Sequence, residues 1–477
     1  MSRSPNLLFI LADQWRAMAL GSAGTDPVHT PNLDRLAAQG MHLRQAVSNY
    51  PVCSPHRAML MTGQYPHRNG VHSNFNSASD PAVSTLSAHS TCWPEVLAAA
   101  GYRTAYVGKW HLNRPVPADA VHGEGRRADG RVWDAYTPPE YRHGFARWYA
   151  HGCSDQHFHP HYWVDRAPRE EPVRLQQWSA EHESDQALRL LREHQEEQER
   201  AGTTDPFALM LSYNPPHPPF EQVPQRYVDR YRDVPVEQLL TRANVDLSTA
   251  EGQEAARAVR LYFAAVTGVD EQIGRVLAGL EELGLSEDTL VVFTSDHGMQ
   301  LGSHGLQSKN IWFEESLRVP FLARLPGRIP AGVDDVLLST PDIAPTLLRL
   351  LGQEVPASMQ GRDLSGALMG RDFERPGGAL YLRMPSTAGW EDWRGWRTAD
   401  RLLVCRRGQH GLVPMHLYDL AEDPWQLRDV LVDRPAEAER LRSELIAELA
   451  AVGDPWAQAA GAVSPADDTR ATTPSTS

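Results

Sequence analysis

Four short polar clusters in this sequence place carboxylate, imidazole and amine side chains at the ends of apolar runs. The apolar runs are NLLFILA, TAYVG, FALMLS and TLVVFTS, and the clusters that follow them are Asp13-Gln14, Lys109-Trp110-His111, Tyr213-Asn214-Pro215-Pro216-His217 and Asp296-His297-Gly298. A short, nearly continuous apolar run predicts a buried parallel strand. Because ligands bind just beyond the carboxyl ends of the strands in open α/β sheets, we expect the four clusters to meet at one site.

One of the four cysteines lies in a different polar setting, the stretch PVCSPHRAMLMTGQYPHRNGV from Pro51 to Val71. Cys53 stands near a histidine and an arginine, just before an apolar run that is typical of a helix. A free cysteine is usually a small buried hydrophobe, and for Cys53 taken alone this interpretation stays open. The other three cysteines are far apart and form no CxxC spacing, which predicts neither a disulfide framework nor a cysteine zinc cluster.

Helices must connect the strands and position the clusters. The patterns predict a helix over residues 31–39, a solvated amphipathic helix that starts at Ser184, a long helix over 254–283, and a helix that starts at Pro341 and stops at Gly352. Together with the buried strands they predict a large α/β domain. From about Gly377 the sequence changes to shorter alternating strands and a helix over 435–452, which predicts a smaller α+β domain.

Length and composition bound the organisation and the partners. The 477 residues are too many for one ordinary core, and we expect a domain at 1–375, a smaller domain at 376–456 and a disordered, Ser/Thr/Pro-rich tail at 457–477. A formal charge of −14 argues against nucleic acid or an anionic membrane as the main partner. No stretch approaches the roughly 18 apolar residues of a membrane helix. The N-terminal segment predicts a core strand rather than a signal peptide, so we expect a cytoplasmic protein.

The segment Cys53-Ser54-Pro55-His56-Arg57, followed by Thr62-Gly63, resembles the C-x-P-x-R signature of the type I sulfatases, a family of the alkaline phosphatase superfamily. Further segments stand in the order of that family: LADQW, TPNLDRLAAQG, GYRTAYVGKWHL, PPHPPF, VDEQIGRVLAGLEELGL, TSDHGMQLGSHG and DIAPTLLRLLG. The resemblance covers most of the chain to about residue 365, and YDLAEDPWQLRDV resembles the family's C-terminal end. It implies an alkaline phosphatase-like fold, in which helices sandwich a large mixed, mostly parallel sheet, with a smaller C-terminal α+β domain.

The resemblance also implies an activity, hydrolysis of a sulfate ester at the S–O bond. In the family the signature cysteine, here Cys53, is converted to formylglycine by a formylglycine-generating enzyme. The aldehyde hydrate can attack sulfur with one hydroxyl, and loss of the proton from the second hydroxyl then expels sulfate and restores the aldehyde. The implied substrate is a small sulfate ester or a sulfated sugar, and assembly into a homo-oligomer is a further expectation.

The implied catalytic residues supply positive charge and proton transfer around this nucleophile. A group whose oxygens are already negative must be approached with positive charge at hand. Arg57 is implied to orient the formylglycine, Lys109 and Lys309 are candidate cations for the sulfuryl oxygens with His217 as a further donor, and His111 is the candidate base for sulfate release. Whether one of the lysines or His217 protonates the leaving alcohol stays open.

A divalent metal ion is the second implied cofactor. Asp13 and Asp296 would provide anionic oxygens, Gln14 a carbonyl oxygen and His297 a ring nitrogen, next to the modified Cys53. Hard cations favour oxygen-rich sites, so we expect calcium first, with magnesium or manganese as alternatives. The commoner family pattern has a second aspartate where this chain has Gln14, which removes one negative charge from the site.

Other interpretations remain open at this point. Taken separately, Asp296-His297-Gly298 could be a turn, His217 could lie in a polyproline surface loop, and the two lysines could be ordinary surface charges. A phosphonate monoester or phosphodiester hydrolase of the same superfamily is the closest competing function, although Lys109-Trp110-His111 favours a sulfatase. A catalytically inactive binding protein on the same fold is the competing class.

The segment HGCSDQHFHPHYW carries three alternating histidines. A strand would place His157, His159 and His161 on one face, which is a geometry suited to a metal. No carboxylate or cysteine stands at a matching spacing, so a polar pocket wall or surface loop is favoured, and we expect a substrate-recognition insert. The tryptophans of the later segment GWEDWRGW, Trp390, Trp393 and Trp396, are expected to be packing anchors rather than sugar platforms.

Overall fold

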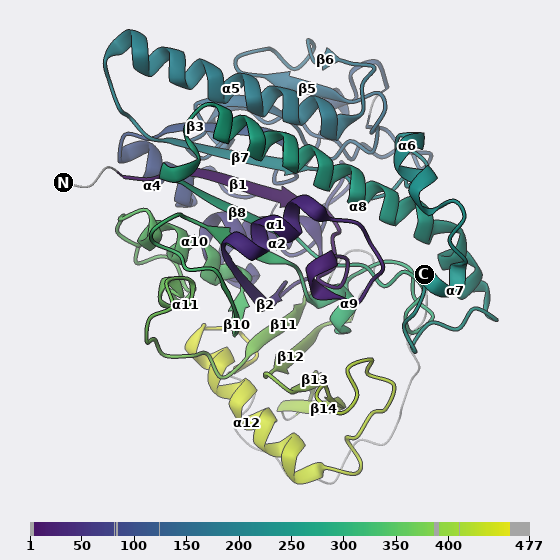
Figure 1. Ribbon diagram of the computed structural model, residues 1–477. Helices are drawn as coiled ribbons and strands as arrows, with labels where there is room; N and C mark the ends of the chain where they lie inside the picture. Colours follow the sequence, from purple (N-terminus) through teal and green to yellow (C-terminus); the bar gives the residue numbers. More distant parts are fainter. Residues whose placement is uncertain are drawn as a thin grey trace.

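A ten-stranded sheet runs through the larger part of the chain, and helices cover both of its faces (Figure 1). The computed structural model describes residues 4–80, 82, 84–123, 125–385, 391–409 and 411–457. The strand order is β10-β2-β9-β8-β1-β7-β3-β4-β5-β6, and β8, β1, β7, β3 and β4 run parallel. The strands are β1 (Asn6–Ala12), β2 (Met41–Val47), β3 (Arg103–Lys109), β4 (Arg147–His151), β5 (His161–Val164), β6 (Val173–Arg174), β7 (Phe207–Tyr213), β8 (Thr289–Ser295), β9 (Phe321–Arg324) and β10 (Gly332–Ser339).

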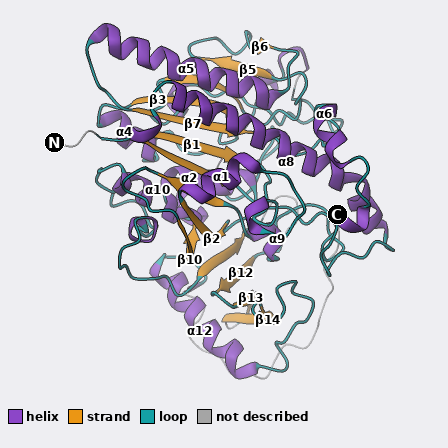
Figure 2. Ribbon diagram, in the orientation of Figure 1, coloured by secondary structure: helices purple, strands orange, loops and turns teal. Residues whose placement is uncertain are grey.

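The two faces of β1 bury alternate side chains in two separate cores. Leu8 and Ile10 pack with residues of α1 (Pro31–Gln39), α5 (Ser179–Ala201) and α8 (Ala250–Glu282). Leu7 and Phe9 pack with residues of α2 (Cys53–Thr62), α4 (Trp93–Ala99) and α10 (Thr340–Leu350). Because successive side chains of a strand point to opposite faces, a fully apolar strand requires a core on each side. The predicted helix-sandwiched α/β fold is confirmed (Figure 2).

The four strands predicted to carry the polar clusters are β1, β3, β7 and β8, and they lie side by side in the sheet. Two helices begin earlier than predicted. Helix α8 begins at Ala250, where the Thr249 hydroxyl accepts a hydrogen bond from the backbone N–H of Gly252. Helix α5 begins at Ser179, five residues before the predicted Ser184, and it is not merely a solvated helix, because Leu188 and Leu191 are buried in the core.

A second, antiparallel sheet of four strands forms at the C-terminal end and lies at the lower end of the view in Figure 1. Its strands are β11 (Ala379–Arg383), β12 (Trp393–Arg397), β13 (Arg401–Gly408) and β14 (Gly411–Asp419), and α12 (Pro435–Ala451) packs against it. Trp393 and Trp396 are buried here, as expected of packing anchors. Trp390 and residues 458–477 lie outside the described residues, so the predicted disordered tail and the predicted domain boundaries stay predictions.

Short helices and 3-10 turns complete the chain. They are α3 (Pro66–Asn69), α6 (Gln225–Val228), α7 (Val236–Leu239), α9 (Glu314–Leu317) and α11 (Ser365–Leu368), and the 3-10 turns η1 (Gly21–Ala23), η3 (Pro117–Asp119), η4 (Val121–Gly123), η5 (Pro139–Tyr141), η6 (Asp229–Tyr231) and η7 (Ser286–Asp288). Within the described ranges, no helix has the length and apolar character that a membrane span requires.

Gly108 fixes the end of β3, one residue before Lys109. Its φ is +103°, and a Cβ there would lie 2.0 Å from the carbonyl oxygen of Ser212 on β7. We expect Gly108→Ala to lower the free energy of unfolding by more than about 2 kcal/mol, because the substitution adds backbone overlap to an unfavourable φ. Gly24→Ala is the control, since Gly24 also has a positive φ of +67° but open space around its Cβ, and should cost about 1 kcal/mol. Urea unfolding measures both, and equal losses would show that the contact with Ser212 does not matter.

Candidate active site

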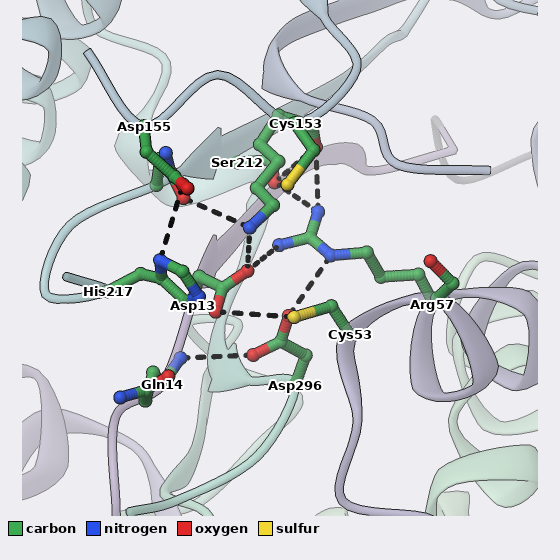
Figure 3. A network of polar contacts seen from close by, with 12 residues as sticks. Asp13, Gln14, Cys53, Arg57, Cys153, Asp155, Ser212, His217 and Asp296 are labelled. Carbon is green, nitrogen blue, oxygen red and sulfur yellow. Dashed lines mark hydrogen bonds and ion pairs between the residues drawn. The ribbon is translucent and has the colours of Figure 1, made fainter. Parts of the chain in front are cut away.

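The polar residues at the ends of β1, β3, β7 and β8 meet at one place, as predicted (Figure 3). Asp13 follows β1, Lys109 ends β3, and Asp296 follows β8. The Lys109 Nζ lies 2.6 Å from Asp13 Oδ2, and both side chains are fully buried. Four adjacent parallel strands therefore bring together side chains that are up to 283 positions apart in the sequence.

Cys53 is the first residue of α2, and the spacing of its motif is the spacing of one helical turn. Arg57 stands four residues later on the same side of the helix, so both side chains reach the strand ends. Gly63 ends the helix with a φ of 63°, a conformation that glycine adopts without steric cost. The positive end of the helix dipole lies at Cys53, where it favours a negative charge.

Arg57 ties the two aspartates to the sheet. Its Nε donates to Asp296 Oδ2 at 3.0 Å, and its Nη2 donates to Asp13 Oδ2 at 3.2 Å. Its Nη1 donates to the Lys109 carbonyl oxygen at 2.7 Å and to Ser212 Oγ at 2.9 Å. A fork of five donors can hold several oxygen atoms in fixed positions, so Arg57 orients the carboxylates.

Two residues that hold this cluster had no role assigned from the sequence, although Asn214 stands in one of the four polar clusters that were expected to meet here. Ser212 accepts from Arg57, and Asn214 Oδ1 accepts from Lys109 Nζ at 3.1 Å. Both lie at the carboxyl end of β7, which is the only signal that could have pointed to them. Serine and asparagine are common at strand ends, so residue type alone does not distinguish them.

A group of four side chains has the donor set and the spacing of a metal site. Asp13, Cys53, Asp296 and His297 place one donor atom each within 4.8 Å of the others. His297 Nε2 lies 3.2 Å from Cys53 Sγ and 3.5 Å from one oxygen of each aspartate. Neighbouring ligands around a cation bound at about 2.3–2.6 Å have such separations. The residues present therefore fit a divalent ion.

Two contacts with the backbone orient His297 and Asp296 within this group. His297 Nδ1 lies 3.0 Å from the carbonyl oxygen of Gly298, so Nδ1 carries the proton and Nε2 offers its lone pair to the cluster. The backbone N–H of Gln14 donates to Asp296 Oδ1 at 3.1 Å. The Gln14 side chain reaches the same region, where its Oε1 accepts from Lys309 Nζ at 2.9 Å.

The two carboxylates of the site have opposite pKa shifts. Burial acts to raise the pKa of Asp13, but the neighbouring basic side chains, Lys109 foremost, hold that pKa well below its ordinary value. Burial, and then the charge of Asp13, raise the pKa of Asp296. A cation between two such carboxylates favours the ionised form of both. The electrostatics of the pair thus agree with the donor geometry.

Cys53 lies in a positive environment despite its burial. Burial and the charge of Asp13 would raise its pKa, but Lys309, Lys109 and His297 lower the pKa to about 5. Lys309 Nζ is 3.4 Å from the sulfur atom. The same charges would stabilise an oxygen anion at this position, because they act on charge rather than on the element that carries it.

The two predicted catalytic histidines are neutral. Burial, followed by nearby positive charge, holds the pKa values of His111 and His217 well below their ordinary range. Both ring nitrogens of His111 are buried and lack a hydrogen-bond partner within the described part of the chain. His217 Nδ1 lies 2.8 Å from the Pro218 carbonyl oxygen and therefore carries the proton. Each ring can accept a proton from a group in the cavity.

A cavity of about 550 Å³ opens above these residues. Its lining includes five of the predicted site residues, which are Gln14, Cys53, His111, His217 and Lys309. Lys109, Arg57 and the two aspartates do not line it. The site thus has a surface layer that a substrate can touch and a buried layer that holds it.

The three alternating histidines of 157–161 do not form one face. Strand β5 begins only at His161, whose Nε2 lies 2.6 Å from Asp134 Oδ2. His157 Nε2 donates to the His217 carbonyl oxygen at 2.8 Å, and His159 is exposed. None of the three belongs to a group of metal-ligating side chains in the described ranges. The metal geometry considered for them is therefore wrong, since residues 157–160 are not a strand.

Comparisons with known proteins agree with one another. The family model Sulfatase matches residues 5–353, and the model N-sulphoglucosamine sulphohydrolase, C-terminal, matches residues 302–454. An endo-4-O-sulfatase of Bacteroides thetaiotaomicron is 39% identical, over 95% of this chain and 93% of that protein. An ulvan-active sulfatase of Formosa agariphila is 34% identical, over 93% of this chain and 80% of that protein. A solved structure from Bacteroides fragilis, described as a sulfatase, superposes with a TM-score of 0.90 at 34% identity and covers 97% of this chain and 99% of that one.

Proposed function

Because this chain belongs to the sulfatase family and hydrolyses sulfate esters, we propose that it acts on a sulfated saccharide through a formylglycine made from Cys53 and one divalent cation. The observation that carries the proposal is the position of Cys53 Sγ. It lies 3.2 Å from His297 Nε2, 3.4 Å from Lys309 Nζ and 3.7 Å from Asp13 Oδ1, and it lines the cavity. A structural cysteine would not need a ring of charged groups around its sulfur.

The cofactors have separate tasks in this proposal. Formylglycine supplies an aldehyde whose hydrate is a nucleophile that a thiol or a serine cannot replace. The cation, held by Asp13, Gln14, Asp296 and His297 next to residue 53, supplies positive charge near the reacting oxygen atoms. Oxygen-rich ligands favour calcium, with magnesium or manganese as alternatives.

The chain's own residues bind and orient the sulfate group. Lys309 touches the cavity and is the cation placed to contact the sulfuryl oxygens and to donate a proton to the leaving alcohol. Lys109 is behind Asp13, so its charge acts through the carboxylate rather than by contact. His111 is neutral, buried and unpaired among the described residues, which suits a base that takes a proton at the cavity floor.

The relatives support a saccharide as the substrate class. Two relatives, at 39% and 34% identity, are an endo-4-O-sulfatase and an ulvan-active sulfatase. We therefore propose a sulfated saccharide, with a 4-O-sulfated sugar as the first compound to test. The same relatives favour sulfatase chemistry over the phosphonate hydrolase and over an inactive binding protein. Maturation by a formylglycine-generating enzyme, assembly into a homo-oligomer and cytoplasmic placement are further parts of the proposal.

The test is sulfate release by protein co-expressed with a formylglycine-generating enzyme. We expect ion chromatography to detect sulfate from a 4-O-sulfated disaccharide, and a much slower release of phosphate or phosphonate from matched esters. Protein expressed without the maturation enzyme is the control and should be far less active. Equal activity of the two preparations would overturn the formylglycine mechanism, and hydrolysis of phosphonate esters alone would overturn the substrate class.

A further inference from the structure

A short turn carries two arginines to the mouth of the cavity. Residues 126–132 fold back on themselves through a bridge between Arg126 and Val132 and a hydrogen bond from the Arg127 backbone N–H to the Arg131 carbonyl oxygen at 2.9 Å. Arg127, Arg131 and the following Trp133 line the cavity, whereas Arg126 does not. The proposed chemistry at Cys53 uses none of these residues.

The charges along the cavity wall are unbalanced. Among the described residues that line it, Arg127, Arg131 and Lys309 are the formally charged side chains, and no carboxylate is among them. The chain as a whole has 60 acidic and 46 basic residues, so a wall with cations alone is not what its composition predicts. Lys309 contacts the sulfur of Cys53, but both arginines are exposed. The cavity therefore has one positive charge at its floor and a separate positive pair at its mouth.

Arg127 is held in a defined position. Its Nη2 lies 2.6 Å from Asp155 Oδ2, and its guanidinium lies 4.3 Å from the centre of the Trp133 ring. The other oxygen of Asp155 lies 3.5 Å from His217 Nδ1 (Figure 3). Asp155 thus joins Arg127 to His217, which also lines the cavity, and this contact holds the Arg127 guanidinium at the cavity wall.

Arg131 has more of its donors free. The one acidic partner recorded for it in the described part of the chain is Asp129, at 3.7 Å, and 53% of the Arg131 side chain is exposed. A guanidinium with free N–H groups matches the two oxygens of a carboxylate or sulfate. The segment beside the turn, where the Ser77 N–H donates to the Val132 carbonyl oxygen at 2.9 Å, adds neutral polar groups to the lining that suit sugar hydroxyls: Ser73, Asn74, Asn76 and Ser79.

We propose that Arg127 and Arg131 bind a second anionic group, a carboxylate or sulfate, on the sugar next to the one that carries the scissile sulfate. The substrate would then be an acidic oligosaccharide rather than an isolated sulfate ester. This inference rests on the proposed function, because it concerns the same cavity. Arg127 and Arg131 would select the substrate and take no part in S–O cleavage.

The test compares three substrates on the matured enzyme. They are a 4-O-sulfated hexosamine joined to a hexuronic acid, the same disaccharide with its carboxyl reduced to an alcohol, and a small aryl sulfate. We expect Arg131→Gln to lower kcat/KM for the acidic disaccharide about 5- to 10-fold, mainly through KM, and the double variant with Arg127→Gln to lower it further. Values for the other two substrates should stay within about twofold, since exposed charge changes act only where a partner exists.

Arg126→Gln is the matched control, because it removes a positive charge from the same turn but not from the cavity wall. It should leave all three values nearly unchanged. If Arg131→Gln lowers kcat/KM equally for all three substrates, or for none, the subsite is overturned. A fourth compound, the reduced disaccharide with a second sulfate on its neighbouring sugar, tests which anionic group the two arginines bind. If Arg131→Gln also lowers kcat/KM for this compound, the arginine pair binds a sulfate as well as a carboxylate.

A binding measurement keeps the inference independent of the catalytic proposal. In a Cys53→Ala background, calorimetry should give a Kd for the acidic disaccharide about 5- to 10-fold lower than for the reduced one, and Arg131→Gln should remove that difference. If the native chain hydrolyses none of the sulfate esters but the Kd difference is present, the proposed function fails and the subsite stands. Equal Kd values overturn the subsite, whatever the activity.

Discussion

Cys53→Ala is expected to lower kcat/KM for a sulfate ester by at least about 10,000-fold, with little change in folding. Removal of a catalytic nucleophile has effects of this size, because no neighbouring group can take over the covalent step. The loss of one buried sulfur atom should cost no more than about 2 kcal/mol of the free energy of unfolding. Initial rates measure the first effect and urea unfolding the second.

Cys153→Ala is the matched control for this substitution. Cys153 also lines the cavity, but burial raises the pKa of its thiol to about 12, so it has none of the activation found at Cys53. Its replacement should change kcat/KM by less than about 10-fold. If Cys53→Ala also lowers kcat/KM by less than about 10-fold, the nucleophile must be another residue.

Mass spectrometry of the Cys53 peptide from the native host tests the same proposal without a mutation. Conversion to formylglycine removes one sulfur and two hydrogens and adds one oxygen, and the aldehyde can be trapped with a hydrazine reagent. A peptide that carries only the thiol would contradict the mechanism and restore the inactive binding protein as the better interpretation.

The sequence predicted the centre of the site because its strands are unambiguous. The four apolar runs became β1, β3, β7 and β8, with ends within one residue of the expected positions. Parallel strands deliver their carboxyl ends to one edge of the sheet, so the meeting of Asp13, Lys109 and Asp296 follows from topology. Cys53 was found through its motif, which the structure explains as one turn of α2.

Other features depend on contacts that no local pattern contains. Ser212 and Asn214 look like ordinary strand-end residues until Arg57 and Lys109 reach them from other segments. Lys109 and Lys309 have the same side chain, but only the structure separates the buried one from the one in the cavity. The start of α5 was missed because Trp178 stands at its N-cap, where no side chain supplies a capping bond.

The buried layer of the site explains why so many charges lie below the cavity. Two carboxylates are held by Arg57 and Lys109, and each partner is less than 3% exposed. Such pairs contribute little net stability, because the loss of hydration offsets the attraction between the charges. Their value is positional, since they fix the oxygen atoms that would bind a cation beside residue 53.

Asp13→Asn is expected to abolish metal binding and to lower kcat/KM at least about 1,000-fold. The substitution removes one of two anionic oxygen ligands and with it several kcal/mol of charge stabilisation. Chelation of the native enzyme should give a similar loss that calcium reverses. Metal content per chain by plasma mass spectrometry and initial rates are the two measurements.

Asp13→Asn also affects folding, because Asp13 pairs with buried Lys109. The substitution leaves the Lys109 charge unpaired and should lower the free energy of unfolding by about 3–5 kcal/mol. Asp454→Asn separates the two effects. Asp454 lies beside the second sheet, where its carboxylate pairs at 2.9 Å with Arg394, and both side chains are as buried as those of the active-site pair. This control should also lose stability, although less of it because Arg394 keeps Asp392 at 2.6 Å, and it should keep its metal and its kcat/KM. If Asp13→Asn instead keeps the metal and loses activity only in proportion to the unfolded fraction, then Asp13 supports the fold of the site and is not a ligand.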